Sequence, residues 1–201
     1  MSWFDLNSAD EQSNSDVIPH KTPVKVRMKI RPGSYDDPSQ GWTGGYATRS
    51  QGSGAVYLDC EFTIIGGKFN KRKVWSNVGL YSSKGPKWGE MGRAFMRAAV
   101  ESARSIRPSD ASDQAIQARR INGFADLDGL EFAAFVDVQK PTQEQVAQGY
   151  GDDRNVIQNV IPVTHKDYAA LMAGQGASEP AASAPTPAAS KPVGGMPAWA
   201  S

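Results

Sequence analysis

Two long runs of alternating apolar and polar residues constrain the fold of this chain more than any other feature. In "TPVKVRMKIR" (22–31) and "VYLDCEFTII" (56–65) nearly every second residue is apolar. Side chains of a strand point alternately to opposite faces, so this period predicts two amphipathic strands with one buried face each. Two glycines after the second run then offer a hairpin turn into a third strand, whose apolar face includes Val74, Val78 and Leu80.

Helical spacing replaces the two-residue period between residues 89 and 106. Met91, Phe95 and Ala98 mark one stripe of a helix, and three arginines mark another stripe. We interpret the arginine stripe as a solvated face rather than a row of phosphate contacts. The sequence therefore predicts one amphipathic helix after the third strand.

Two more strands, at 130–138 and 154–163, are expected after this helix, with a polar loop between them and a short helix before and after the pair. The glycine-rich segment 41–54 is expected to be a loop. The chain is then mainly β with some α, in the order strand, strand, strand, helix, strand, strand. That is the element order of the five-stranded OB barrel, with a helix between strands three and four.

Composition limits the folded part of the chain at both ends. Residues 1–20 are polar and acidic and are expected to form a flexible arm. Residues 173–201 form an Ala, Pro, Ser and Gly tail that has too few apolar residues to offset the entropy of ordering it. The OB-like domain is then expected at 21–172, flanked by disordered termini. Trp199, near the end of the tail, is a candidate for docking a partner protein, although an untethered low-complexity end explains it equally well.

The chain has a net charge of +1, but its charges are unevenly distributed. Between residues 66 and 107 there are ten Lys and Arg residues against two acids. The sequence contains no apolar run long enough to cross a membrane, no basic secretory signal at its start, and a single cysteine, Cys60. We expect a cytoplasmic protein, without a membrane partner, that meets an anionic partner through one surface.

Aromatic residues interleaved with cations point to single-stranded nucleic acid as that partner. Strand parity places the four cations of 22–31 on the outward face of the first strand, and Trp75 on the outward face of the third, together with Lys71 and Lys73. Cations follow the phosphates, and aromatic rings stack on bases of any sequence. The predicted binding residues are Lys25, Arg27, Lys29, Arg31, Tyr57, Lys71, Lys73, Trp75, Lys84, Lys87 and Trp88.

These residues also have structural explanations. A row of cations could be the solvated side of a sheet, although unmixed like charges are unfavourable between neighbouring strands. Trp75 could be buried under the helix, because large aromatic residues are more often buried than exposed. Trp88, which follows Lys87 in a Gly/Pro loop, could cap the end of the barrel.

No arrangement of residues in the sequence favours catalysis, and we expect no enzyme activity, cofactor or metal. One cysteine, with His20 and His165, does not support a Cys-His or Ser-His nucleophile. The segment "GGKFNKRK" has glycines and lysines without the spacing of a phosphate-binding loop. The acidic pairs at 36–37, 126–128 and 152–153 are expected to form turns.

Three segments together resemble a known family: "RKVWSNVGLYSSKGPKWGEMGRAFMRAAVESA", "DLDGLEFAAFVDVQ" and "DDRNVIQNVIPV". The resemblance covers roughly 22–163 and includes Asn155 at the start of the last strand. The family is phage-encoded, catalogued as a domain of unknown function, and similar to OB-fold single-stranded-DNA-binding proteins. It implies DNA binding in phage replication or recombination, in the cytoplasm of a bacterial host, and it supplies no established binding residues.

The sequence therefore favours sequence-independent single-stranded DNA binding, with phage recombination or replication proteins as further partners through the tail and homo-oligomerisation left open. One alternative is a protein-interaction adaptor, whose basic segment meets an acidic phage nuclease or recombinase without binding DNA. Another is a metal-dependent nuclease, which needs clustered carboxylates that the sequence does not show. DNA binding requires steep salt dependence and an adaptor does not.

Overall fold

The structure is a computed structural model that describes residues 16–149 and 151–174. This part of the chain is mainly β, with seven strands and a few helices. The strands are β1 (Thr22–Arg31), β2 (Tyr35–Asp37), β3 (Trp42–Arg49), β4 (Val56–Ile65), β5 (Lys73–Tyr81), β6 (Glu131–Gln139) and β7 (Arg154–Val160). The helices are η1 (Pro38–Gln40), α1 (Lys87–Ala103), α2 (Asp113–Ala118), η2 (Phe124–Asp126), α3 (Gln143–Ala147) and α4 (Tyr168–Met172).

Most of the expected N-terminal arm lies outside the described residues, as does the expected tail from residue 175 onwards, with Trp199. Ile18 falls within the expected arm but is fully buried. The Asn155 side chain holds it on both sides, accepting a hydrogen bond from the Ile18 N–H and donating one to the Ile18 carbonyl, each 2.8 Å long. The folded part therefore begins before residue 21.

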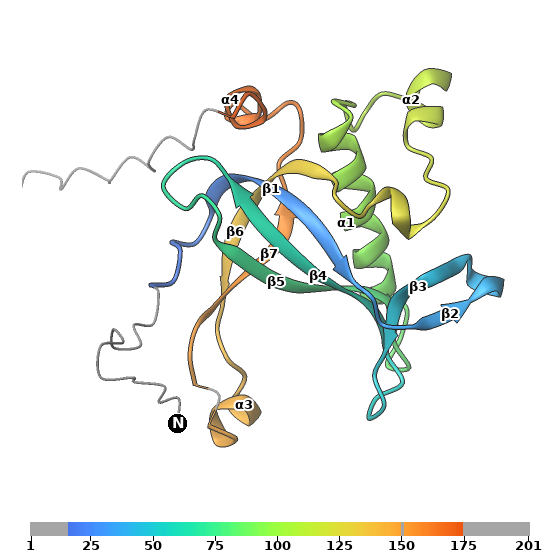
Figure 1. Ribbon diagram of the computed structural model, residues 1–201, viewed down its shortest axis with the longest axis vertical. Helices are drawn as coiled ribbons and strands as arrows, with labels where there is room; N and C mark the ends of the chain where they lie inside the picture. The colour runs from blue at the N-terminus through green and yellow to red at the C-terminus, as the bar shows by residue number, and fades with distance from the viewer. Residues whose placement is uncertain (1–15, 150, 175–201) are drawn as a thin grey trace, which may run out of the picture.

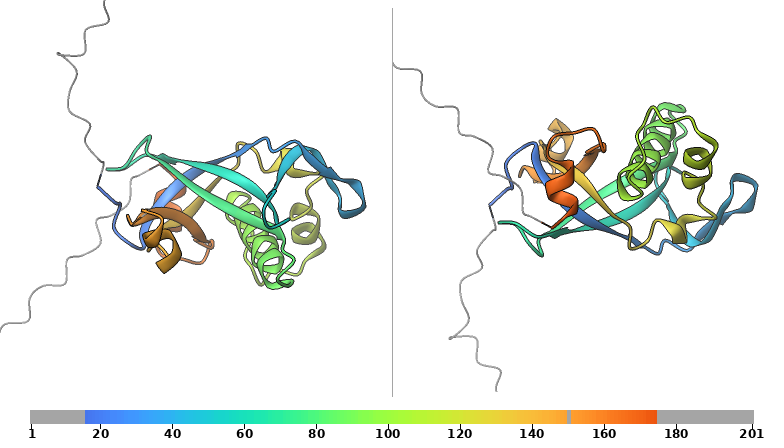
Figure 2. Two further views of the ribbon diagram at one scale, coloured as in Figure 1. Left: turned by 90° about the horizontal axis from the view of Figure 1, so that it is seen from below. Right: turned by 90° about the horizontal axis from the view of Figure 1, so that it is seen from above.

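The strands form one antiparallel sheet that curls into a half-barrel (Figures 1 and 2). Its order is β2-β3-β4-β1-β6-β7, and β5 pairs with the other edge of β4. The curl brings β5 beside β7, where the Ile157 N–H donates to Ser76 Oγ over 2.7 Å. Within the described residues no backbone ladder joins these two strands. The two edges of the sheet therefore meet through a side chain.

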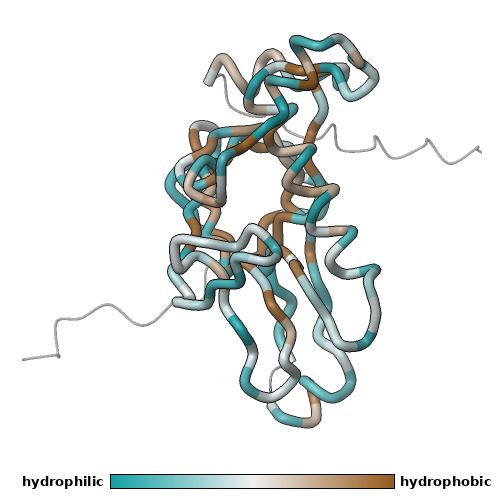
Figure 3. Tube along the Cα trace, turned by 90° about the vertical axis from the view of Figure 1, so that its right-hand side faces the viewer, coloured by the Kyte–Doolittle hydropathy of each residue, from teal (hydrophilic) through white to brown (hydrophobic). Residues whose placement is uncertain are grey.

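The core lies inside this curl, lined by the alternating apolar positions that the sequence predicts. Figure 3 shows apolar and polar stretches following one another along the chain. The aromatic ring of Phe95, from α1, packs edge-on against Phe62 and Phe132, with centroids 6.2 and 6.1 Å apart. Such pairs contribute about 0.5–1.5 kcal/mol beyond the area that they bury. Phe95 of α1 therefore covers the open side of the half-barrel, whereas Met91, which the sequence places on the same apolar stripe, is 59% exposed, so the expected stripe is wrong at that position.

Glycines allow α1 to lie directly against the backbone of β5. A Cβ atom on Gly92 would lie 1.8 Å from the carbonyl oxygen of Gly79, and one on Gly89 would lie 2.5 Å from that of Leu80. A residue with a side chain cannot fit at either helix position without moving one of the two elements. This contact fixes α1, and with it the connection 82–86, against the end of β5.

The structure has seven strands where the sequence predicts five, because the expected loop at 41–54 contains most of a hairpin. β2 and β3 form this hairpin, and Trp42 and Tyr46 pack against the core. Gly44 and Gly45 have φ angles of 86° and 69° inside β3. Residues other than glycine rarely adopt such angles, so these glycines shape the strand and also interrupt its two-residue period.

Smaller differences concern the ends of elements. α1 begins at Lys87, so Lys87 and Trp88 belong to its first turn and not to a loop. The expected loop 139–153 contains α3, which Thr142 caps with a capping box. α4 begins at Tyr168, and its N-cap residue is Asp167. The strands at 22–31, 56–65 and 130–138 are confirmed to within one residue.

Candidate functional site

The outer face, meaning the side of β1, β4 and β5 that points away from the core, carries most of the predicted binding residues. The strand register aligns Lys29 with Glu61 and Glu61 with Trp75 in one row across the three strands. A second row runs from Arg27 to Lys73 through Thr63, and a third row begins at Arg31. The predicted cations of β1 and β5 therefore share one surface with Trp75.

Carboxylates of the neighbouring strands interrupt the cations of this face, so the prediction of an unmixed cationic row is wrong. Lys25 Nζ lies 2.9 Å from Glu131, and the Arg27 Nε–H donates to the same carboxylate over 2.9 Å. Farther along β1, Arg31 lies 3.5 Å from Asp59. Five cations of β1 and β5 thus face three acids of β4 and β6, which leaves a weakly basic face.

Glu131 forms ion pairs with both Lys25 and Arg27. Its hydrogen bonds with Lys25, and then with Arg27, lower the pKa of its carboxyl group. Lys25 itself is largely covered, with 15% of its side chain exposed. Lys25 and Arg27 are therefore held by protein carboxylates, while Lys29 has no carboxylate within 4.0 Å among the described residues.

Trp75 is exposed, as strand parity predicts. Val74, Val78 and Leu80 are each at most 6% exposed, whereas Trp75 retains 50% of its accessible surface. Its partner across the sheet is Glu61, which forms a 2.9 Å ion pair with Lys73. The alternative of a Trp75 buried beneath the helix is excluded.

Tyr57 and Trp88 pack on each other instead of standing free. Their ring centroids are 6.2 Å apart with a tilt of 51° between the planes. Trp88 also covers Gly79, where a Cβ atom would lie 2.5 Å from the indole. Both rings are half-buried. Trp88 therefore packs against β4 and β5 and presents less of its surface than Trp75 does.

Two groups of cations flank β5 and have no carboxylate within 4.0 Å among the described residues. The basic turn (66–72), which precedes β5, contains Lys68, Lys71 and Arg72. Lys68 and Arg72 lie 5.7 and 5.8 Å from the ring centroid of Phe69, a cation–π distance. Lys71 lies in this turn with a φ angle of 68°, so its predicted place on the strand face beside Trp75 is wrong.

The second group, the basic corner (84–93), follows β5 and comprises Lys84, Lys87 and Arg93. All three side chains are exposed. The sequence places Lys84 and Lys87 among the binding residues but interprets Arg93 as part of a solvated helix face. The signal for Arg93 was its place within the same basic segment as Lys84 and Lys87, in the first turns of α1.

The other arginines of the expected helix stripe hold the structure together. Arg97 and Arg119 both contact Glu101, through N–O distances of 2.9 and 2.6 Å. Arg104 Nη1 donates to the carbonyls of Ala118 and Arg120 over 2.6 and 2.9 Å. These bonds tie α1 to the segment that follows α2, so these guanidinium groups have protein partners.

Several of the groups considered for catalysis have structural roles. Asp37 caps η1, which is a local turn, whereas Asp36 accepts from the Gly45 N–H across the β2–β3 hairpin and Asp128 accepts from the Ile30 N–H of β1. The expected turn role is therefore confirmed for Asp37, and Asp36 and Asp128 instead join separate segments. Burial raises the pKa of the Cys60 thiol far above its usual range, which makes it a poor nucleophile. In 16–149 and 151–174 no three His, Cys, Asp or Glu residues gather where a metal could bind.

In the described segments, no helix has the length and apolar character needed to cross a membrane. No protein-family model matches the chain, and no curated protein matches it significantly.

Proposed function

We propose that the protein binds single-stranded DNA along β5, independently of base sequence. The observation that carries the proposal is Trp75, half exposed between two groups of cations for which the described part of the chain supplies no carboxylate within 4.0 Å. The basic turn lies at one end of β5 and the basic corner at the other. Nine residues at about 3.3 Å each make β5 roughly 30 Å long, so a strand laid along it meets cations at both ends. Between them, Trp75 offers a ring on which any base can stack.

The arrangement of strands supports an OB-like barrel. With the β2–β3 hairpin taken as an insertion in the first connection, the remaining strands are β1, β4, β5, β6 and β7, with α1 between the third and fourth. Neighbouring strands in the curl run β5-β4-β1-β6-β7, and Ser76 and Ile157 link β7 back to β5. OB-folds bind oligonucleotides on the face of their second and third strands, which here are β4 and β5. The resemblance in sequence supports a role in phage DNA replication or recombination.

The test is the variant Trp75→Ala, compared with wild type for binding of a labelled dT20 oligonucleotide by fluorescence anisotropy. We expect affinity to fall by about 5- to 150-fold, the value of one stacked base. The melting temperature should change little, because half of the side chain is already in water. Trp75→Phe, which keeps an aromatic ring, should retain most of the affinity.

Val146→Ala is the matched control, since Val146 is an exposed apolar residue on α3, away from β5. If Trp75→Ala and Val146→Ala bind dT20 with equal affinity, Trp75 does not stack on a base and that part of the proposal is wrong. If wild type binds neither dT20 nor a matched duplex at low salt, the protein-interaction adaptor is the better reading of the basic segment.

A further inference from the structure

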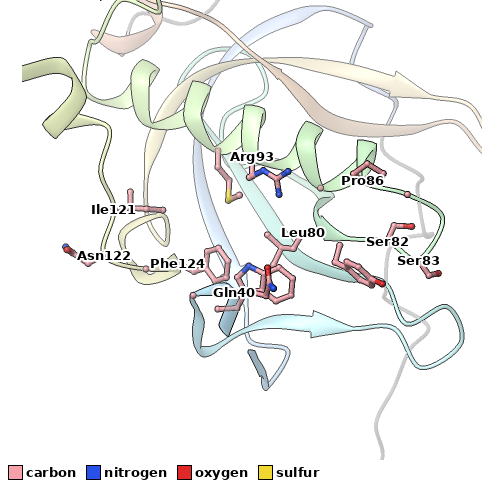
Figure 4. A pocket seen from close by; sticks show the side chains of 16 residues that line it. Gln40, Leu80, Ser82, Ser83, Pro86, Arg93, Ile121, Asn122 and Phe124 are labelled. Atoms are coloured by element: carbon pink, nitrogen blue, oxygen red, sulfur yellow. The ribbon is translucent and has the colours of Figure 1, made fainter. Parts of the chain in front are cut away.

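A groove of about 890 Å³ lies off the outer face, where β5 ends. Its walls are the tip of the β2–β3 hairpin, the end of β5 with the following connection, the first turns of α1, and residues 121–124 before β6 (Figure 4). The volume is within the roughly 300–1,000 Å³ of typical ligand sites. No predicted binding residue lines it.

The lining of this groove combines flat rings with a single charge. Arg93 is its one charged side chain, and its aromatic side chains are Trp42, Tyr81 and Phe124. Tyr81 is 51% exposed and Trp42 is half-buried, so both present ring surface. Serine hydroxyls and the amides of the lining add neutral hydrogen-bonding groups. This chemistry suits a ligand with a planar ring and a negative charge.

The position of α1 strengthens the preference for an anion. The Arg93 guanidinium lies over the first turn, since a Cβ atom on Gly89 would be 3.7 Å from its Nη1. α1 begins at the edge of the groove, and its N-cap residue, Pro86, makes no side-chain cap hydrogen bond. Glu90 is the acid of the first turn, and it does not line the groove. The N-terminal end of a helix carries a partial positive charge. Lys84 and Lys87 belong to the same segment, and the neighbouring Trp88 packs toward the outer face.

We propose that this groove holds one or two nucleotides of the single strand that crosses β5, with a base against Tyr81 and Trp42 and a phosphate on Arg93. The inference rests on the proposed function. It extends the path of the strand from the outer face around the basic corner to the hairpin. An acidic peptide would satisfy Arg93 but leave the exposed rings without a flat partner.

The test compares Arg93→Ala and Tyr81→Ala with Arg107→Ala, which removes an exposed arginine that lines no part of the groove. Binding of dT20 is measured by anisotropy over a series of salt concentrations. Losing one phosphate contact should make the slope of log K against log salt shallower by about 0.7 in Arg93→Ala, but not in Arg107→Ala. Tyr81→Ala should weaken binding about 5- to 150-fold, and Tyr81→Phe should restore it.

Ultraviolet cross-linking of dT20, followed by peptide mapping, provides a readout that needs no variant. We expect cross-links at Trp42 or Tyr81 in addition to Trp75. If Trp75→Ala weakens binding while both groove variants match Arg107→Ala, and cross-links are confined to Trp75, the groove inference is overturned and the proposed function stands. If wild type does not bind dT20, the proposed function fails and the groove inference fails with it.

Discussion

Glu131 accepts hydrogen bonds from two of the cations that the sequence predicts as phosphate contacts. Its carboxylate competes with any phosphate for Lys25 and Arg27, because an ion pair within the protein must break before either cation can bind DNA. Glu131 thus offsets the charge of two of the four cations of β1, and Asp59 pairs with a third, Arg31.

The DNA affinity of the variant Glu131→Gln should therefore depend more steeply on salt concentration than that of wild type. Two freed cations would add up to about 1.4 to the magnitude of the slope of log K against log salt, at about 0.7 per contact. Asp153→Asn makes the same change in net charge at an exposed loop position and should leave the slope unchanged. If the salt slope of Glu131→Gln equals that of wild type, Lys25 and Arg27 do not contact DNA and the bound strand follows β5 alone. The slopes come from the anisotropy titrations described above.

The same variant has a pH signature in its stability. The pKa of Glu131 is lowered in the folded state, so its ion pairs stabilise the fold above the pKa of the unfolded chain and are lost as pH falls through the folded pKa. Pairs near the surface contribute up to about 1 kcal/mol, or roughly 2–4 °C in melting temperature for a domain of this size. Glu131→Gln should melt lower by that amount at pH 7 and approach wild type as the pH falls below the ordinary glutamate range and through the lowered folded pKa.

Parity allowed the exposure of Trp75 to be predicted, because a strand shows its alternation in sequence. The acids that pair with β1 could not be predicted in the same way. Asp59 and Glu131 lie on other strands, and which residues they oppose depends on register, which one sequence does not specify. The charge of a sheet face is therefore a property of several strands together.

Among the elements, long strands with an unbroken two-residue period were predicted well, and short or glycine-rich ones were missed. β4 alternates over ten residues, and β1 alternates from Val24 to Arg31. β3 does not alternate cleanly because Gly44 and Gly45 lie within it, and β2 has only three residues. The hairpin that forms one wall of the groove was consequently expected as a loop, and the groove could not be anticipated.

The packing of α1 on β5 leads to a prediction at the scale of elements. Gly92→Ala improves helix propensity by about 1 kcal/mol, but its Cβ would overlap the Gly79 carbonyl. Overpacking of this kind costs about 1–3 kcal/mol, and here the contact is with backbone, so we expect net destabilisation. Gly52→Ala, where nothing lies within 4 Å, is the control and should be close to neutral. Thermal melting of both variants measures the difference, and a Gly92→Ala as stable as Gly52→Ala would contradict it.

At the scale of the whole molecule, the order of the strands and the helix was predictable, but the closure of the sheet was not. The sequence shows five long strands and one amphipathic helix, and their order suggests a barrel. Whether the last strand pairs fully with β5 depends on the twist accumulated over the sheet and on the glycines that draw α1 against β5. We call the contact between β5 and β7 the seam. Within the described residues it has a hydrogen bond from the Ile157 N–H to Ser76 Oγ and no backbone ladder.

Because of this seam, the free energy of local unfolding should differ between the strands of the sheet. β1 and β4 are paired along both edges, whereas β5 and β7 each have a ladder on one edge only within the described residues. Native-state hydrogen exchange should find the slowest amides in β1 and β4, and Ser76→Ala should speed exchange at Ile157 without affecting β1. Equally slow exchange in β5 would contradict this. A nucleic acid lying along β5 would then rest on the part of the barrel that opens most readily, and its binding would slow exchange there first.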